Sequence, residues 1–301
     1  MTADLVLVPE LLAPGDLANS ATYAPGVFPD EGIRERVGFF VPDYIDNPNP
    51  EWMTRFPHLQ AVQLPTVGFD AALAHLPTGV TLCNAAGVHE QSTAELTVGL
   101  IIAKWRGLDR AARDMAEGTW DHRRGRSLQE AKVLIIGAGG VGSRIENALA
   151  PLGARTQLVG RARRERVAGV DELPELMGDA DVVVLAVPLT PETEGMVDDS
   201  FLSRMQDGAL LVNVARGSVV VMEDLLAHLP RIEAALDVVD PEPLPIDHPL
   251  WRAPGVLISP HIGGDTDAFP RLARQLIAAQ VERWRTGEPL ANVVIRGDLS
   301  P

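Results

Sequence analysis

Cysteine is almost absent from this chain of 301 residues, which carries a single one, Cys83. One thiol can form neither an intrachain disulfide nor a thiolate metal cluster, so the sequence excludes both. Cys83 ends a short apolar stretch, residues 80–83, which we predict to be a strand. A buried structural thiol therefore fits this position better than a catalytic nucleophile.

Positive charge is also scarce. The chain has 26 Lys and Arg against 41 Asp and Glu, which gives a formal charge of −15. A nucleic-acid partner requires a basic face, so this charge balance argues against nucleic-acid binding. An anionic substrate would have to be held by locally placed positive side chains, because the overall field does not favour it.

Long apolar runs are missing as well. No window of about 18 consecutive apolar residues occurs, so we expect no membrane span and no membrane partner. The N-terminal residues have neither the charged segment nor the long apolar stretch of a signal peptide. We therefore expect a cytoplasmic protein.

A glycine-rich turn is the most informative feature that is present. The apolar run 132–136 leads directly into Gly-Ala-Gly-Gly-Val-Gly at 137–142, and a helix pattern follows over 143–152. A strand, a Gly-x-Gly-x-x-Gly turn and a helix in this order are typical of a dinucleotide site, with the pyrophosphate at the helix N-terminus. The predicted phosphate-binding residues are Gly137, Gly139, Gly140, Val141 and Gly142.

The next strand, predicted over 154–159, ends without the acidic residue that usually binds the ribose 2′-hydroxyl of NAD. Gly160 stands there instead, followed by Arg161, Arg163 and Arg164. Guanidinium groups bind phosphate through paired donors, so this tip favours the 2′-phosphate of NADP(H), with NAD(H) as the alternative cofactor. The competing interpretation is a solvated basic turn that a charged helix continues from Glu165.

The strand pattern predicts an α/β fold of two domains. In the first 95 residues, apolar runs at 5–8, 37–41, 59–64 and 80–83 predict strands, with a Pro- and Asn-rich surface loop over 42–50. A helix is predicted over 92–117, with a Ser92/Glu95 capping box. Further apolar runs at 133–136, 156–159, 182–187, 209–214, 232–238 and 256–259 are typical of a parallel sheet covered on both faces, and a last helix is expected over 267–285.

We therefore predict a Rossmann-type doubly wound parallel sheet inserted into a smaller flavodoxin-like α/β substrate domain. The predicted division assigns residues 1–95 to the first part of the substrate domain, 96–265 to the nucleotide-binding domain, and 266–301 to a crossing helix that returns to the substrate domain.

Three ionisable residues lie just past the ends of predicted strands: Arg216, Glu242 and His261. Ligands of open parallel sheets bind beyond the carboxyl ends of the strands, so these residues are candidates for the site. Each has a simpler explanation: a helix cap for Arg216, a Pro-stiffened loop for Glu242, a structural imidazole for His261. Their joint position at strand ends of one sheet favours the site.

Five ordered segments resemble the D-isomer-specific 2-hydroxyacid dehydrogenase family. Three signatures are matched by Asn-Val-Ala-Arg-Gly at 213–217, Leu-Asp-Val-Val-Asp-Pro-Glu-Pro-Leu at 236–244 and Ser-Pro-His-Ile-Gly-Gly at 259–264. Val-Pro-Leu-Thr-Pro-Glu-Thr at 187–193 and Asn-Ala-Ala-Gly-Val at 84–88 match two more. The resemblance covers nearly the whole chain, and it does not identify the substrate.

The resemblance implies a role for each matched residue. Arg216 would bind the substrate carboxylate and polarise the carbonyl, and His261 would be the acid in reduction and the base in oxidation. Glu242 would hold the imidazole. The backbone N–H groups of Val67 and Gly68 would bind the carboxylate.

The resemblance also implies the lining of the cofactor site. Asp237 would contact the nicotinamide amide. The other implied cofactor contacts are Val187, Pro188, Thr193, Val214, Ala215, His261 and Gly263. The segment 118–126 would help to form a homodimer, with Trp120 near the neighbouring subunit. No appended regulatory domain is expected, and no histidines are spaced as metal ligands.

The implied activity is reduction of a small 2-oxo acid, such as glyoxylate or hydroxypyruvate, to the D-2-hydroxy acid. A phosphite- or phosphoglycerate-type dehydrogenase and a nucleotide-sensing corepressor share this fold and stay open as alternatives. Formate dehydrogenases have Gln at the position of Glu242, which disfavours that branch.

Overall fold

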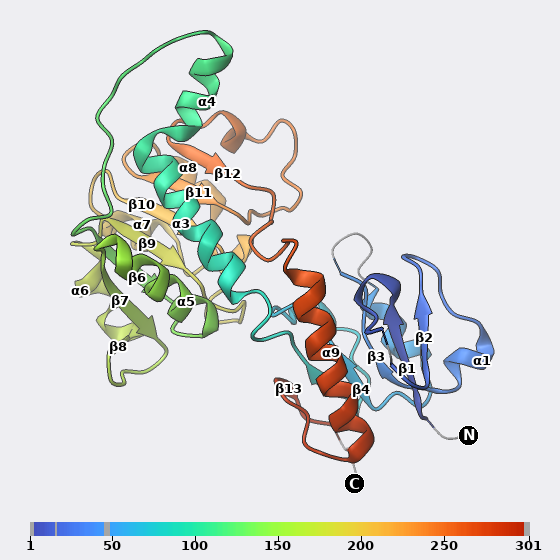
Figure 1. Ribbon diagram of the computed structural model, residues 1–301. Coiled ribbons are helices and arrows are strands. Elements are labelled where there is room, and N and C mark those ends of the chain that lie inside the picture. Colours follow the sequence, from blue (N-terminus) through green and yellow to red (C-terminus); the bar gives the residue numbers. More distant parts are fainter. Residues whose placement is uncertain (1–2, 16, 45–48, 298–301) are drawn as a thin grey trace. The chain divides into compact units, whose positions relative to one another are not determined.

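Residues 3–15, 17–44 and 49–297 are described in the computed structural model of this chain. The chain divides into two units, Met1–His89 with Thr266–Pro301, and Glu90–Asp265 (Figure 1). The chain thus passes from the first unit to the second between His89 and Glu90, a few residues before the boundary predicted after residue 95. Residues 45–48 of the predicted surface loop lie outside the described residues.

The second unit contains a seven-stranded parallel sheet in the order β12-β11-β10-β9-β6-β7-β8. The chain starts in the middle at β6, runs outward to β8 and then returns to β9 on the other side of β6. This reversal creates a topological switch point between β6 and β9, as in a Rossmann fold, and confirms the predicted architecture. The strands are β6 Lys132–Ile136, β7 Arg155–Gly160, β8 Val167–Gly169, β9 Val182–Leu185, β10 Leu210–Asn213, β11 Glu233–Leu236 and β12 Val256–Ile258.

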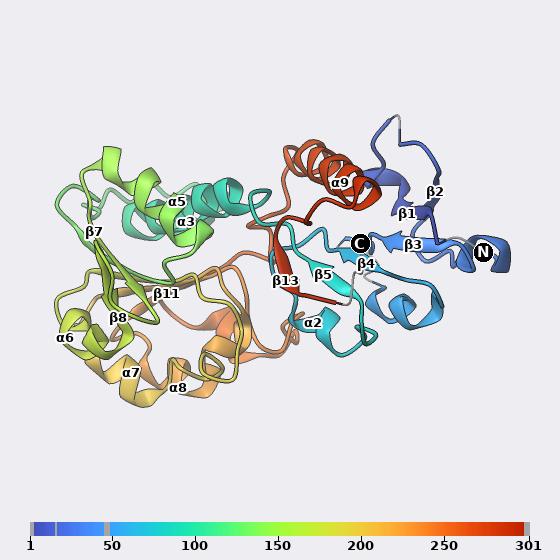
Figure 2. The same cartoon turned by 90° about the horizontal axis from the view of Figure 1, so that it is seen from below.

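Helices cover both faces of this sheet (Figure 2). Alternate residues of β6 point to opposite faces, so Ile135 packs with the side of α3 and α5, and Leu134 packs with the side of α6, α7 and α8. This double burial explains the continuous apolar runs in the sequence. The helices are α3 Glu90–Arg106, α4 Leu108–Ala116, α5 Gly140–Leu149, α6 Leu173–Met177, α7 Asp199–Arg204 and α8 Met222–His228.

The first unit contains a six-stranded sheet in the order β13-β5-β4-β3-β1-β2. Its five N-terminal strands are parallel and follow the flavodoxin-like order, and β13 pairs antiparallel with β5 at one edge. Helix α9 packs on one face, and a cluster rich in aromatic residues covers the other. The elements are β1 Leu5–Pro9, β2 Ser20–Tyr23, β3 Val37–Phe40, β4 Ala61–Gln63, β5 Thr81–Cys83, β13 Val293–Ile295, α1 Glu31–Arg34, α2 Asp70–Leu73 and α9 Phe269–Thr286.

The prediction of one helix over 92–117 is wrong in two respects. The helical segment begins at Glu90, so Ser92 lies inside the first turn and cannot cap it, and Glu95 accepts a hydrogen bond from Gln91 Nε2 at 3.1 Å. The segment also breaks at Gly107, whose φ of 64° lies in the left-handed region that ends α3 before α4 begins.

Three short strands were not predicted: β2, β8 and β13. The charged helix considered after Arg164 is absent. Arg164 and Val167 instead exchange two backbone hydrogen bonds of 3.0 Å, which close a tight turn into β8. Within the described ranges, no helix is long and apolar enough to cross a membrane.

Candidate active site

The sheet of the second unit brings the predicted catalytic residues to one edge. Strands β9, β10, β11 and β12 end in register, with Asn213 paired to both Leu185 and Leu236, and Leu236 paired to Ile258. Because the strands are parallel, the loops that carry Arg216, Glu242 and His261 all leave at the same carboxyl edge. This is the edge where open parallel sheets bind ligands.

The glycine turn between β6 and α5 is shaped for a pyrophosphate. Gly137 has a φ of 118°, and a Cβ atom there would lie 2.2 Å from the Ala186 carbonyl oxygen. A Cβ at Gly142 would lie 1.8 Å from the Gly137 oxygen, so the helix packs against the turn only with glycine there.

Gly139, in contrast, faces open space, because a Cβ there would meet no atom within 4 Å. It stands at the start of α5, and no side chain caps the helix. The backbone N–H groups at this end are therefore placed to bind an anion, and Gly140 and Val141 begin the helix that presents them. The residues present fit a dinucleotide.

The three arginines at the tip of β7 have different surroundings. Arg163 Nη1 lies 2.6 Å from Glu172 Oε2, and Glu172 Oε1 accepts the Gly169 N–H at 2.8 Å. Arg164 Nη2 donates to the carbonyl oxygen of Ala138, within the glycine turn, at 2.8 Å. Arg163 and Arg164 are thus engaged in holding the turn.

Arg161 differs from the other two, because its only effect on the described residues is through its charge. A hydrogen bond from Thr190, together with the nearby charge of Arg161, holds the pKa of Glu192 below its usual range. Among the described residues, no hydrogen bond or ion pair of the Arg161 guanidinium is found. Of the three side chains, Arg161 is therefore the one whose donors are available to a phosphate.

His261 and Glu242 form a direct pair. His261 Nδ1 lies 2.5 Å from Glu242 Oε1, and both side chains are exposed. The carboxylate can only accept, so Nδ1 carries the shared hydrogen and Nε2 is left facing outward from the pair. An imidazole held in this way can donate or accept a proton at Nε2.

Asp237 holds the turn that carries His261. Its buried carboxylate accepts hydrogen bonds from Ser259 Oγ at 2.6 Å, Ile262 N–H at 3.0 Å and Gly263 N–H at 2.9 Å. Its carbonyl oxygen accepts the His261 N–H at 2.8 Å. The sequence pattern did not predict this supporting role, and the one signal for it was an acid at the end of an apolar run.

Arg216 follows β10, and Asn213 organises its backbone. The buried Asn213 side chain donates to the Arg216 carbonyl oxygen at 2.9 Å and accepts the Ala215 N–H at 3.0 Å. A Cβ at Gly217 would lie 1.8 Å from the Val239 oxygen, so the chain after Arg216 packs tightly against the β11 loop. Arg216 Nη1 also donates to Ala215 O at 2.8 Å.

The remaining predicted cofactor contacts lie in loops at the same edge. Thr193 Oγ1 donates to the Pro188 carbonyl oxygen at 2.7 Å and accepts the Thr190 N–H at 2.8 Å, which closes the loop after Val187. Val214 is partly buried beside β10. The predicted substrate-binding residues Val67 and Gly68 lie in the first unit, in the loop after β4, and are partly exposed.

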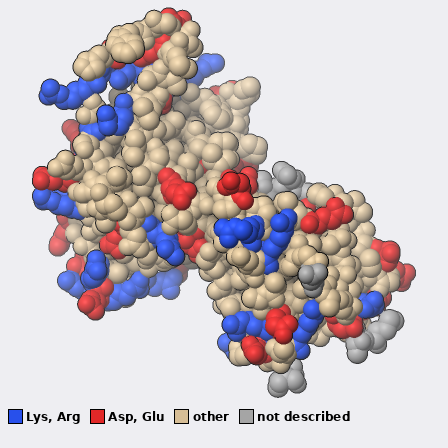
Figure 3. All heavy atoms as spheres, viewed as in Figure 1, with Lys and Arg blue, Asp and Glu red and all other residues tan. Residues whose placement is uncertain are grey.

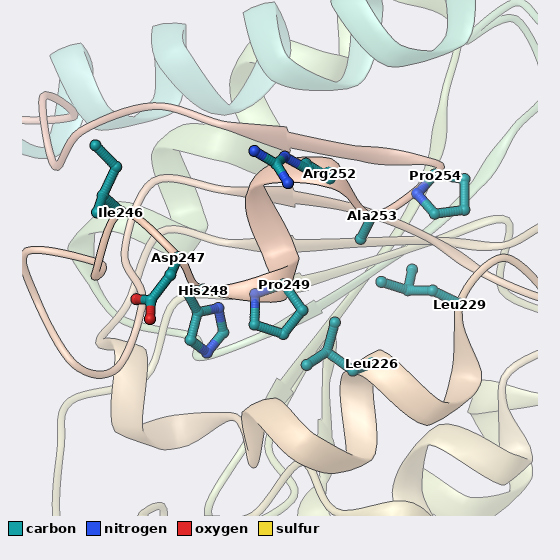
Figure 4. Close-up of a pocket in the computed structure, with 9 residues that line it drawn as sticks. All are labelled: Leu226, Leu229, Ile246, Asp247, His248, Pro249, Arg252, Ala253 and Pro254. Carbon is teal, nitrogen blue, oxygen red and sulfur yellow. The ribbon is translucent and has the colours of Figure 1, made fainter.

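A hollow of about 400 Å³ lies elsewhere in the second unit, and none of the predicted site residues line it (Figure 4). Its apolar part is formed by Leu226, Leu229, Ile246, Pro249, Ala253 and Pro254. His248 points its Nδ1 at the Leu250 N–H, at 3.3 Å, so this histidine caps a short helical turn.

On the face visible in Figure 3, acidic and basic side chains are interspersed.

The family model for the NAD-binding domain of D-isomer-specific 2-hydroxyacid dehydrogenases matches residues 98–263. The chain belongs to this family. The resemblance found in the sequence is confirmed, and this 2-hydroxyacid dehydrogenase is an oxidoreductase that depends on NAD(P).

Curated relatives agree. The dehydrogenase is 34% identical over 249 residues to the glyoxylate reductase/hydroxypyruvate reductase of Homo sapiens. The aligned region covers 77% of this chain and 76% of that protein. It is 32% identical to the D-3-phosphoglycerate dehydrogenase of Methanocaldococcus jannaschii over 72% of this chain, but this match covers only 43% of that protein.

Among solved structures, the dehydrogenase resembles a D-isomer-specific 2-hydroxyacid dehydrogenase from Xanthobacter autotrophicus Py2 in complex with NADPH and MES. The TM-score is 0.83, the sequence identity is 30%, and the match covers 97% of each chain. The agreement over nearly the full length supports the same two-domain fold.

Proposed function

We propose that this dehydrogenase reduces a small 2-oxo acid, glyoxylate or hydroxypyruvate, to the D-2-hydroxy acid with NADPH. The observation that carries the proposal is the 2.5 Å pair of His261 and Glu242 at the sheet edge that also presents Arg216. These groups supply a proton donor and a carboxylate-binding cation. The similarity to glyoxylate reductase/hydroxypyruvate reductase supports the choice of substrate.

Each side chain has a distinct task in this proposal. The guanidinium of Arg216 pairs with the substrate carboxylate through two donors and polarises the adjacent carbonyl. His261 Nε2 gives a proton to the carbonyl oxygen, while Glu242 fixes the ring through Nδ1 and stabilises its positive charge. The N–H groups of Val67 and Gly68 are proposed as further donors to the carboxylate.

NADPH, when bound, supplies the hydride for the carbonyl carbon. The glycine turn, with Gly137, Gly139 and Gly142, would hold its pyrophosphate at the start of α5. Asp237 and the loop closed by Thr193 would contact the rest of the cofactor.

The proposed preference for NADPH rests on the tip of β7. The end of β7 itself carries Gly160 in place of an acid, and no described residue forms a hydrogen bond or ion pair with the Arg161 guanidinium. Glu192, in the loop after β9, is close enough to feel the charge of Arg161, and in this proposal the guanidinium binds the 2′-phosphate beside it. One charge-assisted hydrogen bond contributes roughly 1.5–3 kcal/mol, which corresponds to about a 10- to 100-fold preference.

A second candidate is oxidation of a phosphorylated hydroxy acid, favoured by the similarity to D-3-phosphoglycerate dehydrogenase. The same catalytic set serves both reactions, so substrate binding alone distinguishes them. Phosphite oxidation and a corepressor role rest on the fold and have no further observation in their favour.

The decisive experiment follows cofactor absorbance at 340 nm with a panel of substrates. Glyoxylate, hydroxypyruvate and pyruvate are tested with NADPH and with NADH, and 3-phosphoglycerate, phosphite and formate are tested with NADP⁺ and NAD⁺. We expect the highest kcat/KM for glyoxylate or hydroxypyruvate with NADPH. Turnover of 3-phosphoglycerate alone would replace the proposal by the second candidate, and no turnover with any substrate would contradict both.

A further inference from the structure

The loop after β4 is held in place through its carbonyl oxygens. Four consecutive carbonyl groups each accept a hydrogen bond from within the first unit, and they belong to Pro65, Thr66, Val67 and Gly68. The donors, in the same order, are His89 Nε2 at 2.7 Å, Ala85 N–H at 2.8 Å, Asn84 Nδ2 at 2.8 Å and Thr66 Oγ1 at 2.7 Å. Every carbonyl in this stretch therefore has a defined direction.

Because each peptide group is planar, the direction of a carbonyl also fixes the direction of the N–H group that follows it. In a trans peptide the C=O and the following N–H point to opposite sides. The Thr66 carbonyl faces Ala85, so the Val67 N–H points away from Ala85. The Val67 carbonyl faces Asn84, so the Gly68 N–H points away from Asn84.

These two N–H groups are the part of the loop left for a ligand. Val67 and Gly68 are both partly exposed, and among the described residues neither N–H has an acceptor. Two adjacent backbone donors with fixed directions form a favourable site for a carboxylate.

We propose that Asn84 is a positioning residue for substrate binding: its side-chain amide holds the Val67 carbonyl and thereby aims the Gly68 N–H at the substrate carboxylate. This inference rests on the proposed function, in which the N–H groups of Val67 and Gly68 bind that carboxylate. Asn84 itself does not touch the substrate.

The amide of Asn84 can adopt only one orientation. Its Oδ1 accepts the Ala86 N–H at 3.2 Å, so Nδ2 must face Val67. Its backbone is held on both sides, because its N–H donates to Asn292 O at 3.1 Å and its carbonyl oxygen accepts Gln63 Nε2 at 2.9 Å. Aspartate would keep the acceptor for Ala86 and lose the donor for Val67.

The test compares Asn84→Asp and Asn84→Ala with the control variant Asn292→Asp. Asn292 Nδ2 donates to the Ala86 carbonyl oxygen at 2.9 Å, so the control removes the same kind of bond and adds the same charge in the neighbouring segment. KM and kcat are measured with the best 2-oxo acid. The Kd for NADPH, from fluorescence, and Tm are measured for every variant.

We expect both Asn84 variants to raise KM about 10- to 100-fold, the cost of a carboxylate contact, with the larger effect for aspartate, which also repels the substrate. kcat should change less than about threefold, since binding to the ground state and transition state is lost together. NADPH affinity should stay the same, and Asn292→Asp should leave KM within about twofold. The neutral Asn84→Ala variant serves if Asn84→Asp does not fold.

An unchanged KM in both Asn84 variants of an active enzyme would overturn this inference and leave the proposed function standing. An equal rise of KM in Asn292→Asp would also overturn it, because the effect would then be general to the segment. If the unmodified enzyme turns over no 2-oxo acid, the proposed function fails first and this inference falls with it.

Discussion

His261 adopts a backbone conformation that few residues with side chains adopt. Its φ of 53° lies in the left-handed region, which costs free energy for a residue with a Cβ. The hydrogen bonds of Asp237 to the surrounding turn offset that cost and point the imidazole at Glu242. Backbone strain of this kind is concentrated at functional sites, where neighbouring contacts maintain it.

We predict that His261→Asn lowers kcat for the best 2-oxo acid by about 10²–10⁴-fold. Asparagine tolerates the left-handed region better than most residues, so the turn should keep its shape while the proton donor is lost. Steady-state kinetics measure the effect, and an unchanged Kd for NADPH is the control. A fall of less than about tenfold would contradict the catalytic role.

Cys83 illustrates the opposite case, a reactive group made inert by its surroundings. Burial raises the pKa of its thiol from 9.0 to about 11. At pH 8 the thiolate fraction is then about 100-fold lower than for an exposed thiol, and access is blocked as well. We expect reaction with Ellman's reagent to be slowed at least about 100-fold in the folded protein and restored in denaturant. Equally fast reaction without denaturant would show that the thiol is accessible.

The arginines in the turn between β7 and β8 have different contacts. Arg163 is paired with Glu172, Arg164 holds the carbonyl oxygen of Ala138, and Arg161 is available for the cofactor. Among these three side chains, Arg161 thus has no hydrogen bond or ion pair with the described residues, and a fourth arginine, Arg166, stands at the end of the same turn. Cofactor preference should therefore depend on Arg161 far more than on Arg163.

We predict that Arg161→Ala lowers kcat/KM for NADPH by about 10- to 100-fold and leaves kcat/KM for NADH nearly unchanged. Arg163→Ala is the matched control. It should leave the ratio of kcat/KM for NADPH to kcat/KM for NADH within about threefold of the value for the unmodified enzyme, because an exposed ion pair contributes little. Arg164→Ala should weaken both cofactors together, since Arg164 contacts the glycine turn. Equal use of both cofactors by the unmodified enzyme would refute the NADPH preference.

Apolar side chains are exposed along α4 and the segment after it. Leu108 is 53% exposed, Met115 77% and Trp120 96%. Exposed apolar side chains grouped on one surface segment are typical of an interface, and closed two-fold dimers are the commonest assembly. This agrees with the homodimer implied by the family resemblance, which stays a prediction.

We expect light scattering coupled to gel filtration to give about twice the chain mass of 32.3 kDa. The double substitution Met115→Asp with Trp120→Asp should shift the mass to that of one chain, because it places charges in the buried interface. The matched double variant Val27→Asp with Leu73→Asp, in the first unit, should leave the mass unchanged. A single-chain mass for the unmodified protein at micromolar concentration would contradict the dimer.

The short edge strands are the part of the fold that the sequence pattern does not predict. Strands β8 and β13 have three residues each, and β13 pairs with β5 from the opposite end of the first unit's sequence. Runs of this length carry no clear period. The break at Gly107 was missed for a related reason, since apolar positions continue on both sides of it.

Local patterns alone were enough to establish the central strands, the glycine turn and the strand ends that carry Arg216, Glu242 and His261. Apolar runs and glycine spacing are properties of neighbouring residues, and parallel strands deliver their ends to one edge whatever the details. The supporting contacts were decided by folding. The Asp237 carboxylate accepts hydrogen bonds from N–H groups 25 and 26 residues away in the sequence. The Asn84 side chain donates to the Val67 carbonyl, which is 17 residues away. Such pairs form only when the sheet brings distant loops together, and no local pattern encodes them.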